Sequence, residues 1–491
     1  MVCAYVYQRQ VVGKCICNFT SPKPSGMSVS CGVFCTFAVT EHGDLYVFGS
    51  NTNGILGTGT LVRDHQPIPY RISHDTVFAG EEVGMVASSN FSNAVVTKEG
   101  SLFTWGSVLG LGQGNKHRPL LRNSAPVYID SATFDESPVI MAACGDFCSI
   151  VLTGEGGVWT CGRAQHVGTH TDDDLYHHIP PQQFLGKKIV MVASGASHVL
   201  AIDTEGMLWA WGNNIYGQLC CGVLDGMDNV AIPVMVPPAT FHGSRVVYVA
   251  ACAWTTMVVT ADGVLWVCGY GGYGQLGTGT TQNAMIPVRV GGSERFGGKG
   301  VRMVACSNKH TLIVGTDDRV WACGSTNDFA LGIQDTVDLL QPTLLPDMAM
   351  FTNGNVATVA AGRKHSVFVM QDGTVYTCGR AMHQHPSGNQ SPGGLGCADF
   401  QDGNVAIPHP LSSTLFGNSR IGHWHVGSWL MAHPLEGLAV TMGLRDRLGD
   451  MCLYNNTSAE LIERLLKHNM QFVPTPHKGL LALMGLYDRG L

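Results

Sequence analysis

Hydrophobic runs and short glycine-rich turns alternate over most of the chain, and residues 192–222 show the unit most clearly. They read VASGASHVLAIDTEGMLWAWGNNIYGQLCCG. Two apolar runs, 199–202 and 207–211, flank the polar turn 204–206, and Gly212 then opens a glycine-rich loop. Two strand-like runs joined by a tight turn indicate a β-hairpin. One hairpin cannot bury its own apolar faces, so it needs neighbouring strands.

The same unit recurs along the chain, and the glycine that ends its second apolar run fixes the register. Successive glycines of this kind are 50 to 57 residues apart. They are Gly49, Gly106, Gly162, Gly212, Gly269, Gly324 and Gly379. Each copy adds one strand-like run before the hairpin, as at 246–250, and one after the loop, as at 286–290. Four short strands per repeat are typical of a propeller blade, so the sequence predicts an all-β, seven-bladed β-propeller.

These repeats resemble those of the RCC1 (regulator of chromosome condensation) family. The family repeat has the form C/A-G-x-x-H, an apolar strand, x-x-G-x-V/L-Y/W-x-W/C-G, and N-x-x-G-Q-L-G-x-G. The best matches are 195–222 and 252–279, and the seven copies cover about residues 27–410. The resemblance implies an RCC1-like propeller but leaves the activity open, because one fold hosts many functions.

The chain divides into three parts. We expect an N-terminal strand or arm at 1–26, the propeller at 27–443, and a short helical C-terminal tail at 444–491. Residues 1–10 and 420–442 could together complete a shared blade and close the ring, which would remove exposed sheet edges. Ser458 is the expected N-cap of a tail helix, which either packs on the propeller or docks in a partner's groove.

Composition narrows the classes of partner. Charged residues make up 13% of the chain, and the net charge is −7. A broad phosphate-binding surface needs clustered Lys and Arg, so nucleic acid is not an expected partner. The basic N-terminal tail of nucleosome-binding family members is also missing. No apolar run is long enough for a membrane span or a secretion signal, so we expect an intracellular protein, cytoplasmic or nuclear and not secreted.

The seventeen cysteines are predicted to be buried free thiols. Cys161, Cys268, Cys323 and Cys378 take the position that Trp105 and Trp211 hold in sister copies. A site that exchanges Cys for Trp needs packing rather than a covalent partner. The odd number favours a reducing compartment. Paired spacings such as Cys31 with Cys35 lack a second ligand pair, so we expect no metal and no cofactor.

Two copies carry long loops. In the third, residues 163–184 replace the glycine loop and include His166, His170, Asp172, Asp173, Asp174, His177 and His178. This loop is either a metal site or acidic partner loop, or a solvated insertion on one rim. The spacing lacks an HExxH pair, which favours the insertion. The loop at 381–404 of the seventh copy is the second, and loops on a rigid scaffold commonly bind partners.

The turn G-x-x-H lies at one end of each blade. His198, His310 and His365 keep the family histidine, and Cys35, Ser92, Cys148 and Thr255 replace it. A position that accepts all these residues is a small polar plug, so we assign it a structural role in hydrogen bonding and no role in catalysis.

The residues just before this position are expected to form a partner-binding face. They are aromatic on one side and basic on the other: Phe34, Phe91, Asp146, Phe147, Trp254, Lys309, Arg363 and Lys364. Aromatic residues and arginine are enriched in interface hot spots. The alternative is that some of the aromatic rings turn inward and fill the central channel.

We find no nucleophile–base–acid set and no phosphate-binding P-loop, so no catalytic residue is assigned. The main hypothesis is a monomeric interaction scaffold that binds a protein through this face and the long loops. The alternative is a guanine-nucleotide exchange factor for a small GTPase. In the family's exchange factor for the GTPase Ran, the ring carries acidic residues and a histidine, and here only Asp146 matches an acidic position. A hydrolase or lyase of the propeller type is a remote third hypothesis.

Overall fold

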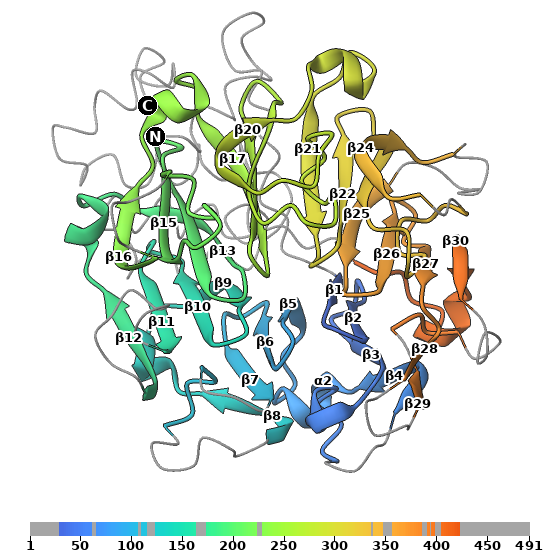
Figure 1. Ribbon diagram of the computed structural model, residues 1–491. Coiled ribbons are helices and arrows are strands. Elements are labelled where there is room, and N and C mark those ends of the chain that lie inside the picture. Colours follow the sequence, from blue (N-terminus) through green and yellow to red (C-terminus); the bar gives the residue numbers. More distant parts are fainter. Residues whose placement is uncertain are drawn as a thin grey trace, which may run out of the picture. The chain divides into compact units, whose positions relative to one another are not determined.

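The computed structural model describes residues 29–60, 65–106, 110–114, 123–163, 173–222, 228–334, 337–346, 356–384, 390–392, 394–397 and 404–422. The predicted arm at 1–26 and helical tail at 444–491 lie outside these residues, as does most of the segment expected to help close the ring. The described part is a ring of seven four-stranded antiparallel sheets, which confirms the predicted seven-bladed, all-β propeller (Figure 1).

The seven sheets, called blades 1 to 7 in chain order, are each built from consecutive strands, apart from a small hairpin inserted in the last. Blades 1 to 4 contain β1–β4 (Val29–Cys31, Cys35–Val39, Leu45–Gly49, Gln66–Ile72), β5–β8 (Val83–Ser88, Ser92–Thr97, Leu102–Gly106, Asn123–Ile129), β9–β12 (Val139–Cys144, Cys148–Thr153, Val158–Gly162, Asp173–Ile179) and β13–β16 (Ile189–Ser194, His198–Asp203, Leu208–Asn213, Asn229–Met235). Blades 5 to 7 contain β17–β20 (Val246–Cys252, Thr255–Thr260, Leu265–Gly269, Ala284–Arg289), β21–β24 (Val301–Cys306, His310–Gly315, Val320–Gly324, Leu339–Leu344) and β25–β27 with β30 (Val356–Ala361, His365–Met370, Val375–Gly379, Val405–Leu411). The inserted hairpin is β28 (Met382–Gln384) and β29 (Gln390–Pro392).

Helical structure in the described residues is confined to single turns. These are α2 (His74–Val77), η2 (Thr52–Gly54), η3 (Ser131–Phe134), η4 (Pro181–Phe184), η5 (Pro238–Phe241), η6 (Ser293–Phe296) and η9 (Ser413–Phe416).

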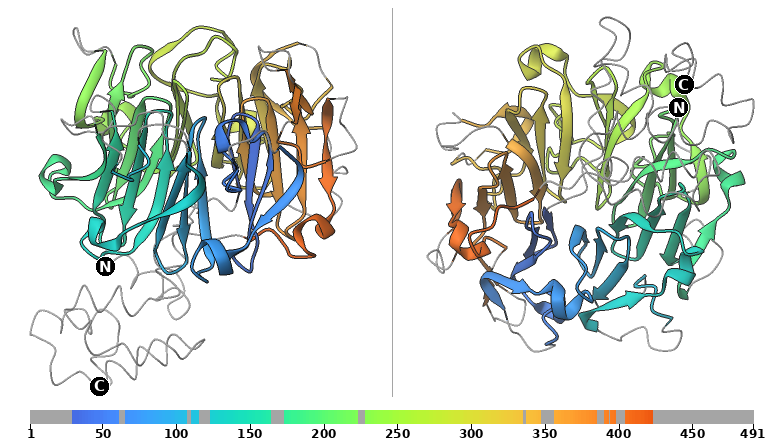
Figure 2. Two further views of the ribbon diagram at one scale, coloured as in Figure 1. Left: turned by 90° about the horizontal axis from the view of Figure 1, so that it is seen from below. Right: turned by 180° about the vertical axis from the view of Figure 1, so that it is seen from behind.

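The first strand of each blade lies nearest the centre of the ring and the fourth lies at the rim (Figures 1 and 2). Six of the seven rim strands contain proline, which blocks pairing of the exposed edge with another chain.

The seven register glycines are required by geometry at the end of each third strand. All have positive φ, between 100° and 139°. A Cβ atom on Gly269 would lie 2.1 Å from the carbonyl oxygen of Trp254, and at the other six the same contact would be 2.1 to 2.5 Å. The backbone of the next turn therefore leaves no room for a side chain, and the left-handed conformation is one that glycine adopts without strain.

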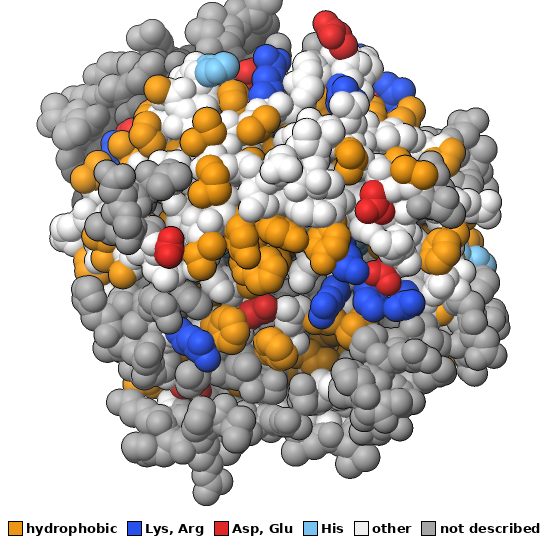
Figure 3. All heavy atoms as spheres, viewed as in Figure 1, with side chains coloured by type: hydrophobic (Ala, Val, Ile, Leu, Met, Phe, Trp, Pro, Cys, Tyr) orange, Lys and Arg blue, Asp and Glu red, His pale blue; other side chains and the backbone are white. Residues whose placement is uncertain are grey.

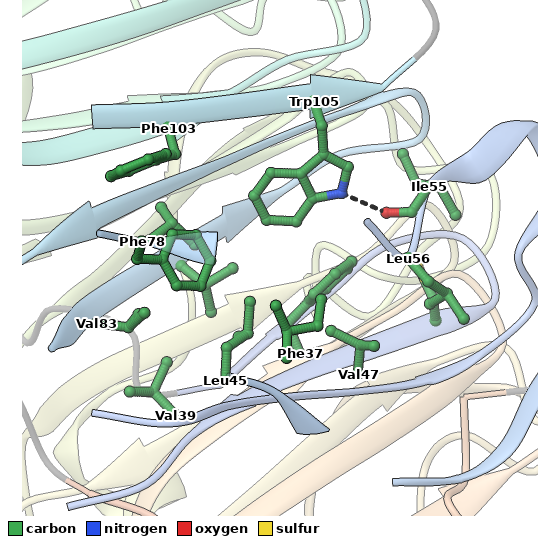
Figure 4. Packing of buried hydrophobic residues seen from close by; sticks show 14 residues of the cluster. Phe37, Val39, Leu45, Val47, Ile55, Leu56, Phe78, Val83, Phe103 and Trp105 are labelled. Atoms are coloured by element: carbon green, nitrogen blue, oxygen red, sulfur yellow. Dashed lines mark hydrogen bonds between the residues drawn. The ribbon is translucent and has the colours of Figure 1, made fainter. Parts of the chain in front are cut away.

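Apolar side chains from neighbouring blades interlock to form the core. Between blades 1 and 2, Phe37 and Leu56 pack with Trp105, which is fully buried (Figure 4). The Trp105 indole donates a hydrogen bond to the Ile55 carbonyl at 2.8 Å. Cys323 occupies the same position in blade 6, and its thiol lies 3.5 Å from the equivalent carbonyl, that of Gln275. Trp and Cys can replace each other at this position because both side chains fill an apolar site and direct a hydrogen-bond donor at the equivalent carbonyl.

A second set of hydrogen bonds joins six of the seven blades to the one before, blade 4 being the exception. A polar side chain near the start of the second strand donates to a carbonyl in the preceding glycine loop, at 2.6 to 2.8 Å. The six donors are Thr36, Asn93, Ser149, Thr256, Thr311 and Ser366. Each of these bonds satisfies one buried donor and one loop carbonyl across a blade junction.

The three family histidines extend this network. His198, His310 and His365 each place Nε2 2.9 Å from a hydroxyl of the following blade, that of Thr256, Ser366 and Thr36 respectively. Because each hydroxyl already donates to a carbonyl, the ring Nε2–H must be the donor. Burial lowers the pKa of His310 to about 3 and that of His365 to about 4. Both rings are therefore neutral at pH 7.

Blade 3 departs from the other blades in the loop after its register glycine, and blade 4 differs at the position that would bond to this loop. The third copy lacks the glycine loop, and the next blade has Val199 where the other six have a hydrogen-bonding side chain. Among the described residues, the buried Trp211 indole N–H of blade 4 finds no acceptor. The interpretation of 163–184 as a rim insertion was only partly right, because 173–179 form β12 and 181–184 form η4.

The ring closes between blades 7 and 1 through the contacts used at other junctions. β1 packs against β25, and Thr36 bonds both His365 and the Gly394 carbonyl. Ile421 also forms a bridge with Thr40, and the Gly422 amide donates to the Val39 carbonyl. Residues just after blade 7 thus join blade 1, whereas the proposed share of residues 1–10 stays a prediction.

Candidate functional site

One end of the propeller carries the turns that join the first and second strands of each blade. We call this end the ring face. In the six blades where the structure describes the residue after the register glycine, its amide donates a hydrogen bond to the carbonyl before the family-histidine position, as in Tyr270 N to Trp254 O at 2.9 Å. Arg163, Ser325 and Arg380 make the same bond in blades 3, 6 and 7. The position after the glycine is thus held beside the residue before the family-histidine position.

Four aromatic side chains form one group on the ring face. Trp254 contacts Tyr216 and Tyr270 at ring-centroid distances of 5.6 and 5.9 Å, and Tyr270 contacts Tyr273 at 6.0 Å. Trp254 is 41% exposed and Tyr273 is 37% exposed. Trp254 and Tyr273 are thus open to solvent, and Tyr216 and Tyr270 are half-buried. We call the four rings the aromatic patch.

A basic cluster lies next to the aromatic patch. Lys309, Lys364 and Arg380 surround one carboxylate, that of Asp328, at nitrogen–oxygen distances of 3.4, 3.8 and 3.6 Å. The Lys309 ammonium also lies 5.3 Å from the Tyr273 ring centroid, which joins the two groups. Figure 3 shows a face on which hydrophobic side chains near the centre border basic ones.

The basic cluster is crowded with like charges. Burial lowers the pKa of Lys364, the Asp328 carboxylate opposes this, and the charges of Arg380, Lys309 and Arg363 lower the pKa further. The Lys364 ammonium also lies 5.6 Å from the Phe34 ring centroid, a cation–π contact. The single carboxylate of Asp328 is thus the shared counter-charge of Lys309, Lys364 and Arg380.

The remaining predicted face residues lie in blades 2 and 3. The Asp146 carboxylate accepts a hydrogen bond of 2.7 Å from the Asn90 side chain. Burial raises its pKa, although Asn90 and the charge of Arg363 act in the opposite direction. Phe147 packs under the Arg163 guanidinium at 4.5 Å, and Phe91 is half-buried. The structure thus joins Phe34, Lys309 and Lys364 to the basic cluster and Trp254 to the aromatic patch.

Sequence reasoning missed the second half of this face. Tyr216, Tyr270, Tyr273, Asp328, Arg163 and Arg380 were assigned to repeat loops or left without a role. The available signal was positional, because each follows a register glycine directly or lies a few residues into the glycine loop. Antiparallel pairing returns these positions to the same end of the blade as the turns.

The loop residues considered for a metal site serve other purposes where the structure describes them. Asp174 is buried and its Oδ1 accepts backbone N–H groups of Gly110, Leu111 and Gly112 at 2.9 to 3.2 Å. His178 stacks on Trp159 with centroids 4.7 Å apart. His166, His170 and Asp172 lie outside the described residues. Within the part of the chain that the structure describes, no group of His, Cys, Asp and Glu could hold a metal ion.

The described portion also contains no helix of the length and apolarity needed to span a membrane. None of its thirteen cysteines forms a disulfide with another described residue. In blades 4 and 5, the buried Cys220 and Cys268 place their sulfur atoms 2.7 Å apart.

Comparisons with known proteins agree with this architecture. Ultraviolet-B receptor UVR8 of Arabidopsis thaliana is 29% identical over 313 residues, 62% of this chain and 67% of that protein. Regulator of chromosome condensation of Mus musculus is 25% identical over 364 residues, 69% of this chain and 80% of that protein. E3 ubiquitin-protein ligase HERC2 of Homo sapiens is 28% identical over 338 residues, but these span only 7% of that protein.

Solved structures and family models give the same result. Prp20p of Saccharomyces cerevisiae, whose binding to Gsp1p and histones has been characterised, superposes with a TM-score of 0.63 at 21% identity, covering 80% of this chain and 88% of that one. The model of the RCC1-like domain matches residues 74–428, and that of the RCC1 repeat matches residues 28–55. The chain therefore belongs to the family of the RCC1-like domain.

Proposed function

We propose that this chain is a non-catalytic interaction protein that binds a partner protein through the ring face. The observation that supports this is the exposed aromatic patch directly beside the basic cluster. Exposed aromatic rings and arginine are enriched in interface hot spots, and a rigid scaffold holds them here in one place. The three buried histidines are engaged in blade-to-blade hydrogen bonds, which argues against a catalytic role for them.

The test is to compare the partners captured by the full chain and by ring-face variants. Trp254→Ala and the double variant Lys309→Ala/Lys364→Ala should each lose the main captured protein. Lys187→Ala is the matched control, because Lys187 pairs with Glu205 at the opposite end of blade 4. Circular dichroism and thermal melting establish that the variants are folded. Capture that survives both ring-face variants would place the binding site elsewhere, for example on the long loops.

A guanine-nucleotide exchange factor for a small GTPase is the second candidate. Similarity to Regulator of chromosome condensation supports it, as does Asp146 at an acidic position of the family's ring. Against it, the Asp146 carboxylate is half-buried and already accepts a hydrogen bond from Asn90. Nucleotide release from a panel of GTPases decides between the candidates. Acceleration that is lost in Asp146→Ala and Trp254→Ala would favour exchange.

A further inference from the structure

Building on the proposed function, we propose that the ring face binds an acidic peptide segment, in which carboxylate side chains lie close to one aromatic or aliphatic anchor. The anchor packs on the aromatic patch, and the carboxylates pair with the basic cluster. This assigns the chemical class of the partner, which the family relationship leaves open.

The charge balance of the face supports an acidic partner. Four cations, Lys309, Arg363, Lys364 and Arg380, act on one another around Lys364. Two carboxylates offset them, because Asp328 lies among three of the cations and Asp146 is attracted to Arg363. For these groups around Lys364 the count, four minus two, leaves an excess of two positive charges, in a chain whose net charge is −7. A carboxylate of the partner would relieve this repulsion.

The two lysines are already positioned for such contacts. The Lys309 ammonium is held between the Tyr273 ring and Asp328, and that of Lys364 between the Phe34 ring and the same carboxylate. Their side chains keep only 25% and 16% of their full exposure. A side chain held in place loses less entropy on binding, so each new ion pair contributes more affinity than a flexible surface pair does.

The aromatic patch and the basic cluster form one continuous band across blades 4 to 7 and blade 1. From Trp254 to Lys309 each successive contact is between 5.3 and 6.0 Å. An extended peptide of about five residues can follow this path, at about 3.3 Å per residue. The anchor and the carboxylates therefore belong to one short segment.

Single-stranded nucleic acid is the competing ligand, since it also uses aromatic rings and cations. An excess of only two positive charges, with two carboxylates inside the patch, favours discrete carboxylates over a continuous phosphate backbone. Direct competition with an oligonucleotide separates the two.

The experiment selects peptides from a random phage-displayed library on the immobilised full-length chain. Selected sequences are then synthesised with a fluorescent label and titrated by anisotropy. We expect two or more Asp or Glu within a few residues of an aromatic or aliphatic side chain. Lys309→Gln/Lys364→Gln should weaken binding about tenfold, and Lys309→Glu/Lys364→Glu more strongly, because each half-buried pair contributes roughly 0.7 kcal/mol. Lys187→Ala should bind like wild type, and raising the salt should weaken the wild-type complex.

The inference is overturned if no acidic consensus emerges, if the lysine variants bind the acidic peptides as tightly as wild type does, or if an RNA oligonucleotide displaces the peptides at lower concentration. These outcomes differ from failure of the proposed function. Neutral peptides that still depend on Trp254 would refute the acidic chemistry and leave the face intact. Peptides and captured proteins that all ignore Trp254→Ala would refute the face itself.

Discussion

The buried histidines make the stability of the propeller dependent on pH, and the size of the effect can be worked out. In the folded state the pKa of His310 is about 3 and that of His365 about 4, chiefly because burial disfavours the charged ring. The ordinary value is 6.5. Below pH 6.5 the unfolded chain therefore takes up these protons before the folded one does. Stability is lost as the pH falls from 6.5 toward the folded values.

At pH 5 each histidine costs about 2 kcal/mol of unfolding free energy relative to pH 7, or about 4 kcal/mol for the pair. Urea unfolding followed by tryptophan fluorescence at pH 7, 6 and 5 measures this directly. His310→Gln and His365→Gln should each reduce the difference between pH 7 and pH 5 by about 2 kcal/mol, and the double variant by about 4.

The control is Thr311→Val, which removes a buried hydrogen bond to the Gln275 carbonyl at the junction of blades 5 and 6. No histidine takes part there, because Thr255 holds the family position in blade 5. This variant should be less stable at every pH and keep the wild-type pH dependence. If the histidine variants keep the full wild-type dependence, the two rings do not stay neutral in the folded state and the reasoning is refuted.

Two further predictions concern the fold. Thr36→Val should cost about 2 to 4 kcal/mol in urea unfolding, because it leaves the His365 N–H and the Gly394 carbonyl buried without partners. Thr256→Val at the junction of blades 4 and 5 should cost the same, and a much smaller loss for Thr36→Val would show that this contact does not hold the ring closed. Gly269→Ala should destabilise by about 3 kcal/mol, since φ is 104° and the Cβ would lie 2.1 Å from a backbone carbonyl. Gly298→Ala, with φ of 77° and no atom within 4 Å, is its control and should cost about 1 kcal/mol; equal losses would mean that the close approach contributes nothing.

The fold could be predicted from the sequence because the same residue types recur at the same positions in every repeat, where the same structural constraint applies. A glycine such as Gly269 recurs since a carbonyl occupies the space of a side chain, and the residues around it alternate with a period of two. Only some of the side chains that form the aromatic patch and the basic cluster could be predicted from the sequence. Positions such as Trp254 are adjacent to a recognisable motif, whereas Asp328 and Tyr216 belong to loops whose path depends on how neighbouring blades stack. The sharing of the Asp328 carboxylate by three cations depends on blades 6 and 7 together, so no single repeat reveals it.

The contrast between blades 3 and 4 shows which sequence changes belong together. The third copy lacks the glycine-loop sequence, and the next blade has Val199 in place of a hydrogen-bonding side chain. A buried hydroxyl without an acceptor is costly, and Val199 avoids that cost at nearly the same volume. Elsewhere the loop carbonyl is present and the hydrogen-bonding side chain is kept. A change in the loop of one repeat is thus accompanied by a change in the neighbouring blade. The sequence of a loop therefore depends on that of the strands packed beside it. A loop on the ring face can change its exposed residues, such as Tyr216, while the buried carbonyl beside it must stay. The aromatic patch and the basic cluster thus lie at positions whose residue type differs from one repeat to the next, beside framework positions that repeat.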